Sequence, residues 1–111
     1  MIRKIIFFEN HFITFYQKQN KKVKGKIQYV LELIQQVDRV PEKFLKHLSG
    51  TDGLYEVRIE FQSNIFRIFC CFDEGKLVVL LNGFQKKTQK TPRKEIEKAL
   101  ELKRRYFEIK G

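Results

Sequence analysis

The sequence predicts an α+β domain: a twisted antiparallel sheet with an N-terminal helical hairpin on one face, followed by a C-terminal helix. Three observations predict this fold class. Apolar residues recur at helical spacing from Val23 to Val37, three strand-like segments follow between residues 54 and 84, and Thr91-Pro92 is a helix start signal. The expected order is β-α-α-β-β-β-α, and 111 residues suit a single domain, 1–111.

The N-terminal elements are expected to be a short strand and two helices. Residues 3–9 are β-branched and aromatic, which is typical of a strand, and Asn10 can cap the helix that follows. A polar turn at residues 17–22 precedes the second helix, which Pro41 is expected to end. The apolar stripe of that helix consists of Val23, Ile27, Val30, Leu31, Ile34 and Val37. The two helices are expected to pack together on one face of the sheet.

The middle of the chain predicts three strands joined by tight turns. The strands are expected at residues 54–61, 65–72 and 77–84, with Ser63-Asn64 and Glu74-Gly75 as their connections. Residues 43–48 are ambiguous between a turn and an extended segment. In the last helix, Thr91 is expected at the N-cap and Pro92 at the first helical position.

The cysteines and the hydropathy pattern indicate an intracellular protein. Cys70 and Cys71 are neighbours in a predicted strand, so they should point to opposite faces, where a disulfide between them would be strained. We therefore expect free thiols and a cytoplasmic location. No segment approaches the roughly 20 apolar residues of a membrane span, and the N-terminus is too short in apolar residues for a signal peptide.

The charge of the chain is strongly positive and unevenly distributed. The net charge is +10, with +5 in residues 1–53, −1 in residues 54–83 and +6 in residues 84–111. The nearly neutral middle segment is typical of a core sheet, and the two basic segments flank it. This balance favours a polyanionic partner such as nucleic acid, although a lysine-rich surface can also serve solubility alone.

Side-chain alternation along the three strands predicts that one basic surface forms. In the first strand, Glu56, Arg58 and Glu60 point away from the apolar face. With the turns given above, Glu60 pairs with Arg67, and Arg67 pairs with Asn82. A bulge would change this register. The residues expected to share the surface are Arg58, Arg67, Asn82, Phe84 and Lys86, with Glu56 and Glu60 at its edge.

Each candidate also has a purely structural interpretation. Arg58 and Arg67 could simply pair with the two glutamates across the strands, and Phe84 could belong to the core. The lysines at positions 86, 87 and 90 could be a solvated run at a strand end. His47 lies in a polar segment, where an exposed histidine without a site role is the simpler interpretation.

The sequence lacks the patterns of several enzyme classes. Two histidines and two adjacent cysteines do not make a zinc site, so no metal and no cofactor are expected. The usual Gly-rich phosphate loop is absent, and no Ser-His-Asp set can be argued. A zinc hydrolase and a nucleotide-binding fold are therefore disfavoured.

Several motifs together resemble a known family, the phage-derived Gp49-like/HigB branch of the RelE/ParE toxin superfamily. The motifs are Phe44-Leu45-Lys46-His47-Leu48, Gly53-Leu54-Tyr55-Glu56-Val57-Arg58, Phe66-Arg67-Ile68-Phe69 and Gly83-Phe84-Gln85-Lys86-Lys87-Thr88-Gln89-Lys90-Thr91-Pro92, with Glu95-Ile96 and Ala99 after them. The combination of the second and last motifs is fairly specific, and the resemblance extends from the first strand to about Phe107.

The resemblance implies a RelE-like fold and the toxin role of a type II toxin–antitoxin system. It implies a cognate antitoxin, expected to be a helix-turn-helix protein, and the ribosome and mRNA as the other partners. Most RelE and HigB relatives cut mRNA in the ribosomal A site, where the RNA 2′-hydroxyl attacks the adjacent phosphate. This chain would then be a metal-independent endoribonuclease (an mRNA interferase) that inhibits translation.

Carried over residue by residue, the resemblance assigns the catalytic positions to Arg58, Arg67, Lys86 and Lys87. Forked guanidinium donors suit a phosphate, and a lysine could act as acid or base. Some relatives place a Tyr or His late in the sheet, whereas this chain has Phe84 there, which cannot transfer a proton. The general acid and base are therefore left unassigned. The RNA-binding candidates are Tyr55 and Phe84, which could stack on a base, together with Lys90, Asn82 and His47.

Two other functions are open at this point. A ParE-like toxin poisons DNA gyrase by binding without catalysis, and the same fold hosts both activities. A plain basic nucleic-acid-binding module is the third interpretation. Whether expression arrests growth, and whether mRNA stays intact during the arrest, would separate the three functions.

Overall fold

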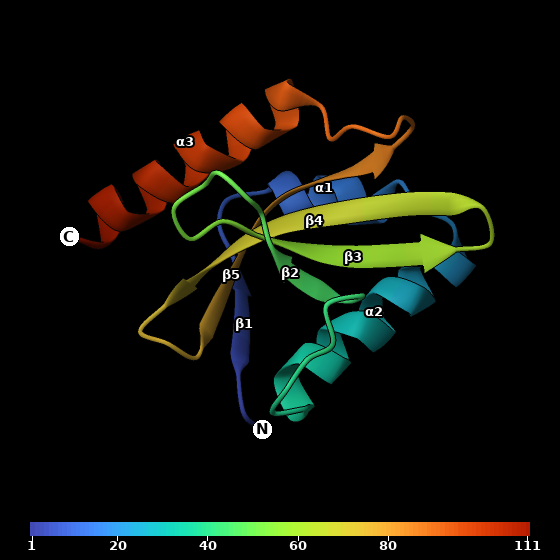
Figure 1. The fold of residues 1–111 in the computed structure, drawn as a ribbon. Helices are drawn as coiled ribbons and strands as arrows, with labels where there is room; N and C mark the ends of the chain where they lie inside the picture. Colours follow the sequence, from blue (N-terminus) through green and yellow to red (C-terminus); the bar gives the residue numbers. More distant parts are fainter.

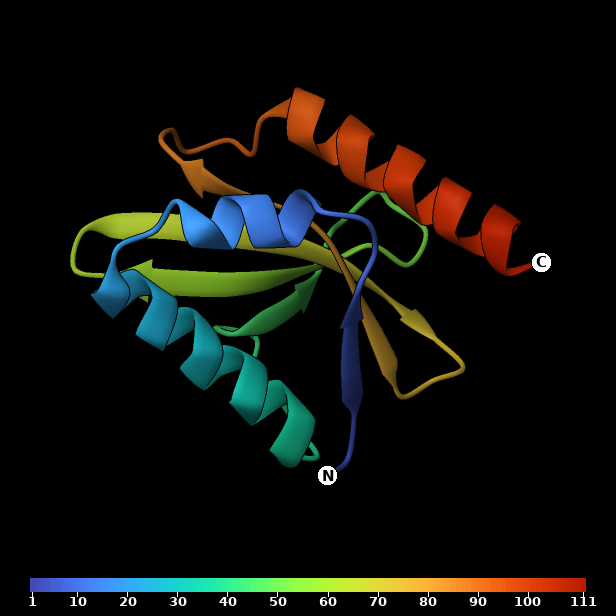
Figure 2. The ribbon, with the colours of Figure 1, turned by 180° about the vertical axis from the view of Figure 1, so that it is seen from behind.

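The computed structural model describes all 111 residues and shows a five-stranded sheet with helices on both faces (Figures 1 and 2). The strand order across the sheet is β1-β5-β4-β3-β2. The elements are β1 (Lys4–Phe7), α1 (His11–Gln17), α2 (Lys21–Gln36), β2 (Leu45–His47), β3 (Tyr55–Phe61), β4 (Asn64–Asp73), β5 (Leu77–Lys86) and α3 (Arg93–Lys110). The predicted α+β class is confirmed, and the ambiguous segment at residues 43–48 supplies an additional strand, β2.

Two hydrophobic clusters, one on each face of the sheet, hold the helices in place. Helices α1 and α2 cover one face, where Phe12, Ile27 and Ile34 pack with Val57 and other buried strand residues. Helix α3 covers part of the opposite face. Figure 1 shows α3 and α2 far apart, on different sides of the sheet. Its cluster consists of Leu54, Phe69, Cys71, Val79, Leu81, Phe84, Ala99 and Leu102. The predicted helical hairpin on one face is therefore present.

The sheet is mixed, because β1 runs parallel to β5 while the other strand pairs are antiparallel. Entirely antiparallel pairing, as expected from the sequence, is thus wrong for this one strand. The two helices that follow β1 separate it from the hairpins, so turn geometry does not dictate its direction.

The N-terminal segment also provides hydrogen bonds to the C-terminal end of α2. The Arg3 guanidinium donates to the carbonyls of Ile34, Val37 and Asp38 at 2.9, 2.8 and 2.7 Å.

The predicted strand register is displaced by two residues. The β3–β4 turn is Gln62-Ser63, closed by the pair Phe61 and Asn64, rather than Ser63-Asn64. Gln62 has φ +57°, which this tight turn requires. Glu60 consequently lies opposite Ile65, and Arg58 lies directly opposite Arg67. Because the side-chain period of a strand is two, a displacement by two residues keeps each side chain on its predicted face.

A bulge in β5 separates two registers of the β4–β5 pair. Arg67 pairs with Phe84 rather than with Asn82, and beyond Ile68 the register shifts by one residue. Leu81 and Asn82 both lie opposite Phe69 as a result. The β4–β5 connection has three residues, since Asp73 pairs with Leu77. The bulge lies beyond the Arg67–Phe84 pair, so that pair stays on its predicted face.

The helix ends differ from the predicted ones in position and chemistry. Helix α2 is capped by Asn20, whose side chain accepts from the Val23 N–H at 2.9 Å, and it ends at Gln36, well before Pro41. Helix α3 begins at Arg93 with Pro92 at the N-cap, so the predicted cap at Thr91 is wrong. No helix is both long and apolar enough to cross a membrane.

Candidate functional site

The two candidate arginines meet at one buried carboxylate. Arg58 Nε and Arg67 Nε lie 3.4 and 3.6 Å from Glu56 Oε1. Glu56 stands on β3 two residues before Arg58, and Arg67 is the cross-strand neighbour of Arg58 on β4. The sheet thus brings two cations and one anion together on the face that α3 leaves partly open, which leaves one net positive charge.

Arg67 is nearly inaccessible, at 3% relative exposure. Its Nη1 donates to the Phe66 carbonyl at 3.2 Å, but its buried Nε has no hydrogen-bond partner. Burial lowers the pKa of the Arg67 guanidinium, and the Glu56 carboxylate opposes that shift. Arg58 is different, because 30% of its side chain is exposed, so it is the arginine that a ligand can reach.

The lysine segment lies at the end of β5, beside the β3–β4 turn. Lys86 pairs with Ile65. It lies on the same face of the sheet as Arg67, because it follows Phe84, the partner of Arg67, by two residues. A hollow of about 410 Å³ opens there, lined by Ser63, Ile65, Lys86, Lys87, Thr88 and Gln89. Lys87 and Lys90 are exposed. Lys90 sits in the loop before α3, where its carbonyl accepts from the Thr88 hydroxyl at 2.9 Å.

Phe84 and Asn82 are buried under α3. Phe84 is 8% exposed, and its ring centroid lies 5.4 Å from that of Phe69. The Asn82 amide donates to the Glu95 carbonyl and carboxylate at 3.2 and 3.0 Å. Both residues lie on the predicted face, but they hold α3 to the sheet. A nucleotide base therefore cannot stack on Phe84 in this structure.

Tyr55 and His47 lie on the opposite face from Arg58 and Arg67. Their ring centroids are 5.2 Å apart, and Tyr55 also packs on Phe72 at 4.9 Å, beside the α1–α2 core.

The sequence analysis did not identify Lys46 as a site residue. Lys46 pairs with Glu56 across β2 and β3 and is exposed on the arginine face. Strand alternation would identify Lys46 once residues 45–47 are known to pair with β3.

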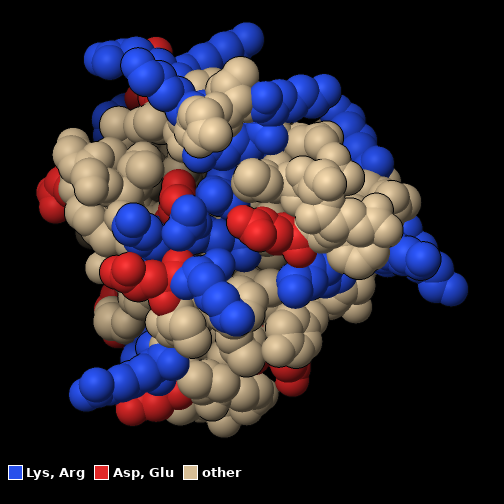
Figure 3. Space-filling view, turned by 45° about the vertical axis from the view of Figure 1, so that its right-hand side comes forward, with Lys and Arg blue, Asp and Glu red and all other residues tan.

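The surface around these residues is basic. Figure 3 shows Lys and Arg side chains spread across one side of the molecule, with a few acidic side chains between them. Lys46, Arg58 and Lys86 supply accessible positive charge on the arginine face, with Lys87 just beyond the end of β5, and Arg67 and Glu56 are buried on that face. Such an arrangement can hold a phosphodiester and stabilise charge that develops on it. The structure contains no group of three His, Cys, Asp or Glu side chains that could hold a metal ion.

Solved structures with a similar fold are RelE–RelB complexes. The chain superposes on one from Pyrococcus horikoshii with a TM-score of 0.57, at 16% identity, over 77% of this chain and 96% of the other. A complex from Methanococcus jannaschii gives 0.55, also at 16% identity, over 83% and 94% of the two chains. These likenesses show a RelE-like fold. No curated protein matches the sequence significantly.

A family model covers most of the chain. The model of the phage-derived Gp49-like proteins matches residues 14–104, which include β2 to β5 and most of the three helices. The matched region contains every candidate site residue, from Lys46 to Lys90. This chain therefore belongs to the family of phage-derived Gp49-like proteins.

Proposed function

We propose that this protein is the toxin of a type II toxin–antitoxin system and that it inhibits translation by cutting mRNA on the ribosome. The observation that carries the proposal is the convergence of Arg58, Lys46 and Lys86 around the Glu56–Arg67 pair, on a RelE-like fold. The cations of this cluster outnumber its carboxylates, and the remaining positive charge suits the backbone of RNA.

The proposed reaction is an internal transesterification. The RNA 2′-oxygen passes its proton to a general base, for which no residue is assigned, and forms a bond to the adjacent phosphorus. The bond from phosphorus to the 5′-oxygen breaks as that oxygen gains a proton from the general acid. Arg58 would bind the phosphate oxygens, because it is the accessible member of the arginine pair. Lys86 and Lys87 would stabilise the leaving oxygen and are the candidates for proton donation. Arg67 would act as a positioning residue that holds Glu56 and, through it, Arg58.

The test is translation of a defined mRNA in a bacterial extract with the purified protein, followed by primer extension. New 5′-ends inside the coding region, which appear only when ribosomes are present, are the expected result. Stalled synthesis with intact mRNA would refute the proposal, and a DNA-damage response in expressing cells with intact mRNA would support a gyrase poison.

We also propose a cognate antitoxin as the partner, expected to be a helix-turn-helix protein. The similar solved structures are of RelE proteins in complex with RelB, and the accessible basic face gives an acidic partner segment a surface to bind. Expression of the chain alone should arrest growth, and co-expression of the adjacent small reading frame should restore it. Growth that continues without the neighbouring protein would contradict this proposal.

A further inference from the structure

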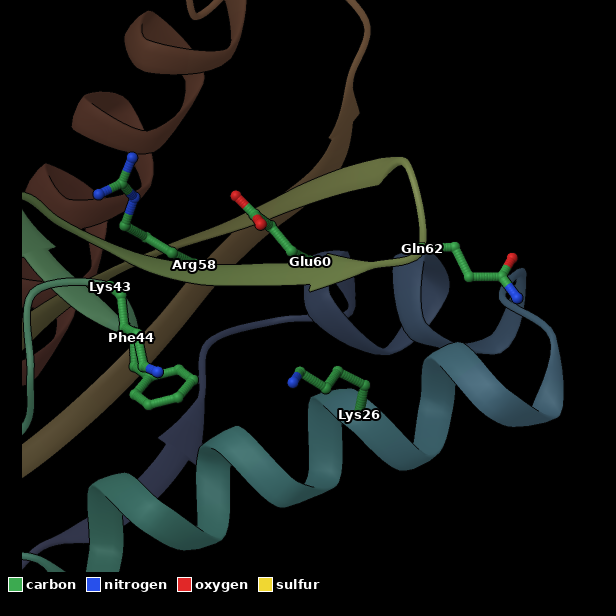
Figure 4. Close-up of a pocket in the computed structure, with 6 residues that line it drawn as sticks. All are labelled: Lys26, Lys43, Phe44, Arg58, Glu60 and Gln62. Carbon is green, nitrogen blue, oxygen red and sulfur yellow. The ribbon is translucent and has the colours of Figure 1, made fainter.

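A separate basic hollow lies at the β2 edge of the sheet, between α2 and β3 (Figure 4). It encloses about 360 Å³ and is lined by Lys26, Lys43, Phe44, Arg58, Glu60 and Gln62. Three of these side chains are cationic and one is anionic. In Figure 4, Lys26 and Phe44 border the space between α2 and β3, while the Glu60 carboxylate and the Arg58 guanidinium both point away from Lys26. We call this site the edge hollow.

Two aromatic rings and two ammonium groups lie close together here: Phe44 lines the edge hollow, and Tyr29 lies beside Phe44, next to the lining. Tyr29 of α2 is 55% exposed, and its ring centroid lies 6.4 Å from that of Phe44. The Lys26 ammonium stands 5.5 Å from the Tyr29 centroid, and the Lys43 ammonium stands 5.0 Å from the Phe44 centroid. Accessible ring faces beside cations are the arrangement with which proteins bind single-stranded nucleic acids, through base stacking and phosphate contacts.

Arg58 connects the edge hollow to the candidate catalytic site. Its backbone N–H donates to the Phe44 carbonyl at 2.8 Å, and its guanidinium reaches both the Glu42 carbonyl and the Glu56 carboxylate. β2 pairs with β3 only as far as Val57, so from Arg58 onward β3 has a neighbouring strand, β4, on one side only. The hollow lies along the open side. A polyanionic chain bound at Arg58 could therefore continue into the hollow.

We propose that the edge hollow binds the single-stranded RNA nucleotide next to the phosphate held at Arg58, with Tyr29 stacking on the base and Lys26 and Lys43 binding the backbone. The proposal deepens the proposed function and rests on it for the identity of the RNA. An acidic peptide would match the charge of the hollow, but it would leave the exposed ring of Tyr29 without a planar partner. The observations therefore favour RNA.

The test is fluorescence anisotropy with the full chain and a labelled 2′-O-methyl oligonucleotide, which binds but lacks the nucleophile for cutting. The double variant Lys26→Gln/Lys43→Gln should reduce the slope of log affinity against log salt by about 1.4, or about 0.7 for each phosphate that the protein no longer neutralises. Tyr29→Ala should weaken binding about tenfold, and Tyr29→Phe should retain wild-type affinity. The matched control is Lys76→Gln/Lys94→Gln, which removes the same charge from exposed positions outside the hollow.

The outcomes separate this proposal from the proposed function. Equal losses in the Lys26/Lys43 and Lys76/Lys94 variants, or unchanged binding in Tyr29→Ala, would overturn the edge hollow as an RNA site. A poly-glutamate peptide that binds with the same dependence on Tyr29 and both lysines would overturn it in favour of a protein partner. Oligonucleotide binding that shows the expected losses, together with absence of mRNA cutting in the extract, would overturn the proposed function alone.

Discussion

At the scale of single residues, substitutions of the two arginines of the candidate site should have different effects, because the two side chains differ in exposure. Arg58 is accessible, so Arg58→Gln should leave the fold intact while reducing mRNA cutting by roughly 10²-fold, the usual cost of losing a group that stabilises charge in the transition state. Primer extension in the extract measures the cutting, and circular dichroism verifies the fold. Wild-type cutting by Arg58→Gln would exclude Arg58 from the site.

Arg67 should instead be needed for stability. Arg67→Ala removes the enclosed partner of the buried Glu56 carboxylate, whereas Arg58 is partly solvated. We therefore expect the free energy of unfolding to fall by roughly 3 kcal/mol in urea denaturation. The double variant Glu56→Gln/Arg67→Met should recover much of this loss, since it removes both buried charges and keeps the volume. If Arg67→Ala and the double variant were equally stable, the loss of stability would not come from the unpaired Glu56 carboxylate.

The cysteines are predicted to be unreactive in the folded protein. Cys70 and Cys71 are both fully buried and point into opposite clusters, as predicted from their position in a strand. Burial raises the pKa of both thiols, that of Cys71 to about 11, so little thiolate forms near neutral pH. A disulfide reagent such as DTNB should label neither thiol until denaturant unfolds the chain. Rapid labelling of the native protein would contradict this burial.

At the scale of elements, α1 is fixed to β5 by a close approach at one glycine. A Cβ added at Gly83 would lie 2.5 Å from Phe15 Cδ2, a distance at which the buried Phe15 ring must move. Gly83→Ala should therefore destabilise the protein by about 1–3 kcal/mol. Gly25 is the matched control, since a Cβ there meets no atom within 4 Å and the residue lies inside α2. Gly25→Ala should be stabilising by about 0.5–1 kcal/mol. Thermal unfolding of both variants measures the contrast.

The C-terminal end of α3 is attached to β4 by a buried aspartate. Asp73 accepts from Tyr106 Oη at 2.7 Å and from Lys110 Nζ at 2.6 Å. The hydrogen bond from Lys110, and next that from Tyr106, lower the pKa of Asp73 below its usual value. A carboxylate with a lowered pKa contributes stability that is present above its unfolded value, and this stability is lost as the pH falls through the folded value.

The lowered pKa of Asp73 therefore predicts that the difference in stability between wild type and Asp73→Asn depends on pH. Wild type should be more stable than Asp73→Asn at pH 7, and the difference in unfolding free energy should shrink as the pH falls below about 4. Urea titrations at several pH values measure it. A difference that stays constant from about pH 7 to about pH 2.5 would mean that the charge of Asp73 does not stabilise α3.

At the scale of the whole molecule, the net charge of +10 should make the proposed binding to ribosomes strongly dependent on salt. Co-sedimentation with ribosomes should weaken by at least about tenfold between roughly 50 and 200 mM KCl, because bound cations release counterions from RNA. Sucrose at matched osmolarity is the control and should change little. Binding that is insensitive to KCl would argue against an electrostatic contact with RNA.

Local patterns in the sequence were sufficient to predict the fold class, the helical hairpin and the face of the candidate arginines. Each of these depends on local periodicity: the helical stripe of α2 repeats every three to four residues, and the strands alternate every two. The face of Arg58 and Arg67 was predicted correctly although the register was wrong, because the error was an even number of residues. The resemblance to the Gp49-like family, noted from sequence motifs, is confirmed by the family model over residues 14–104.

The accessibility of these residues could not be predicted from local patterns and is known from the three-dimensional packing alone. Burial depends on what packs over a residue, so the strand pattern could not show that α3 covers Phe84 and Asn82 or that Arg67 is enclosed. It also could not place Lys46 beside Glu56, because β2 becomes a strand only by pairing with β3. The edge hollow likewise depends on the packing of α2 near the turn before β2, where Tyr29 of α2 lies beside Phe44. Contacts between residues distant in sequence are set by packing, and periodicity within one element carries no information about them.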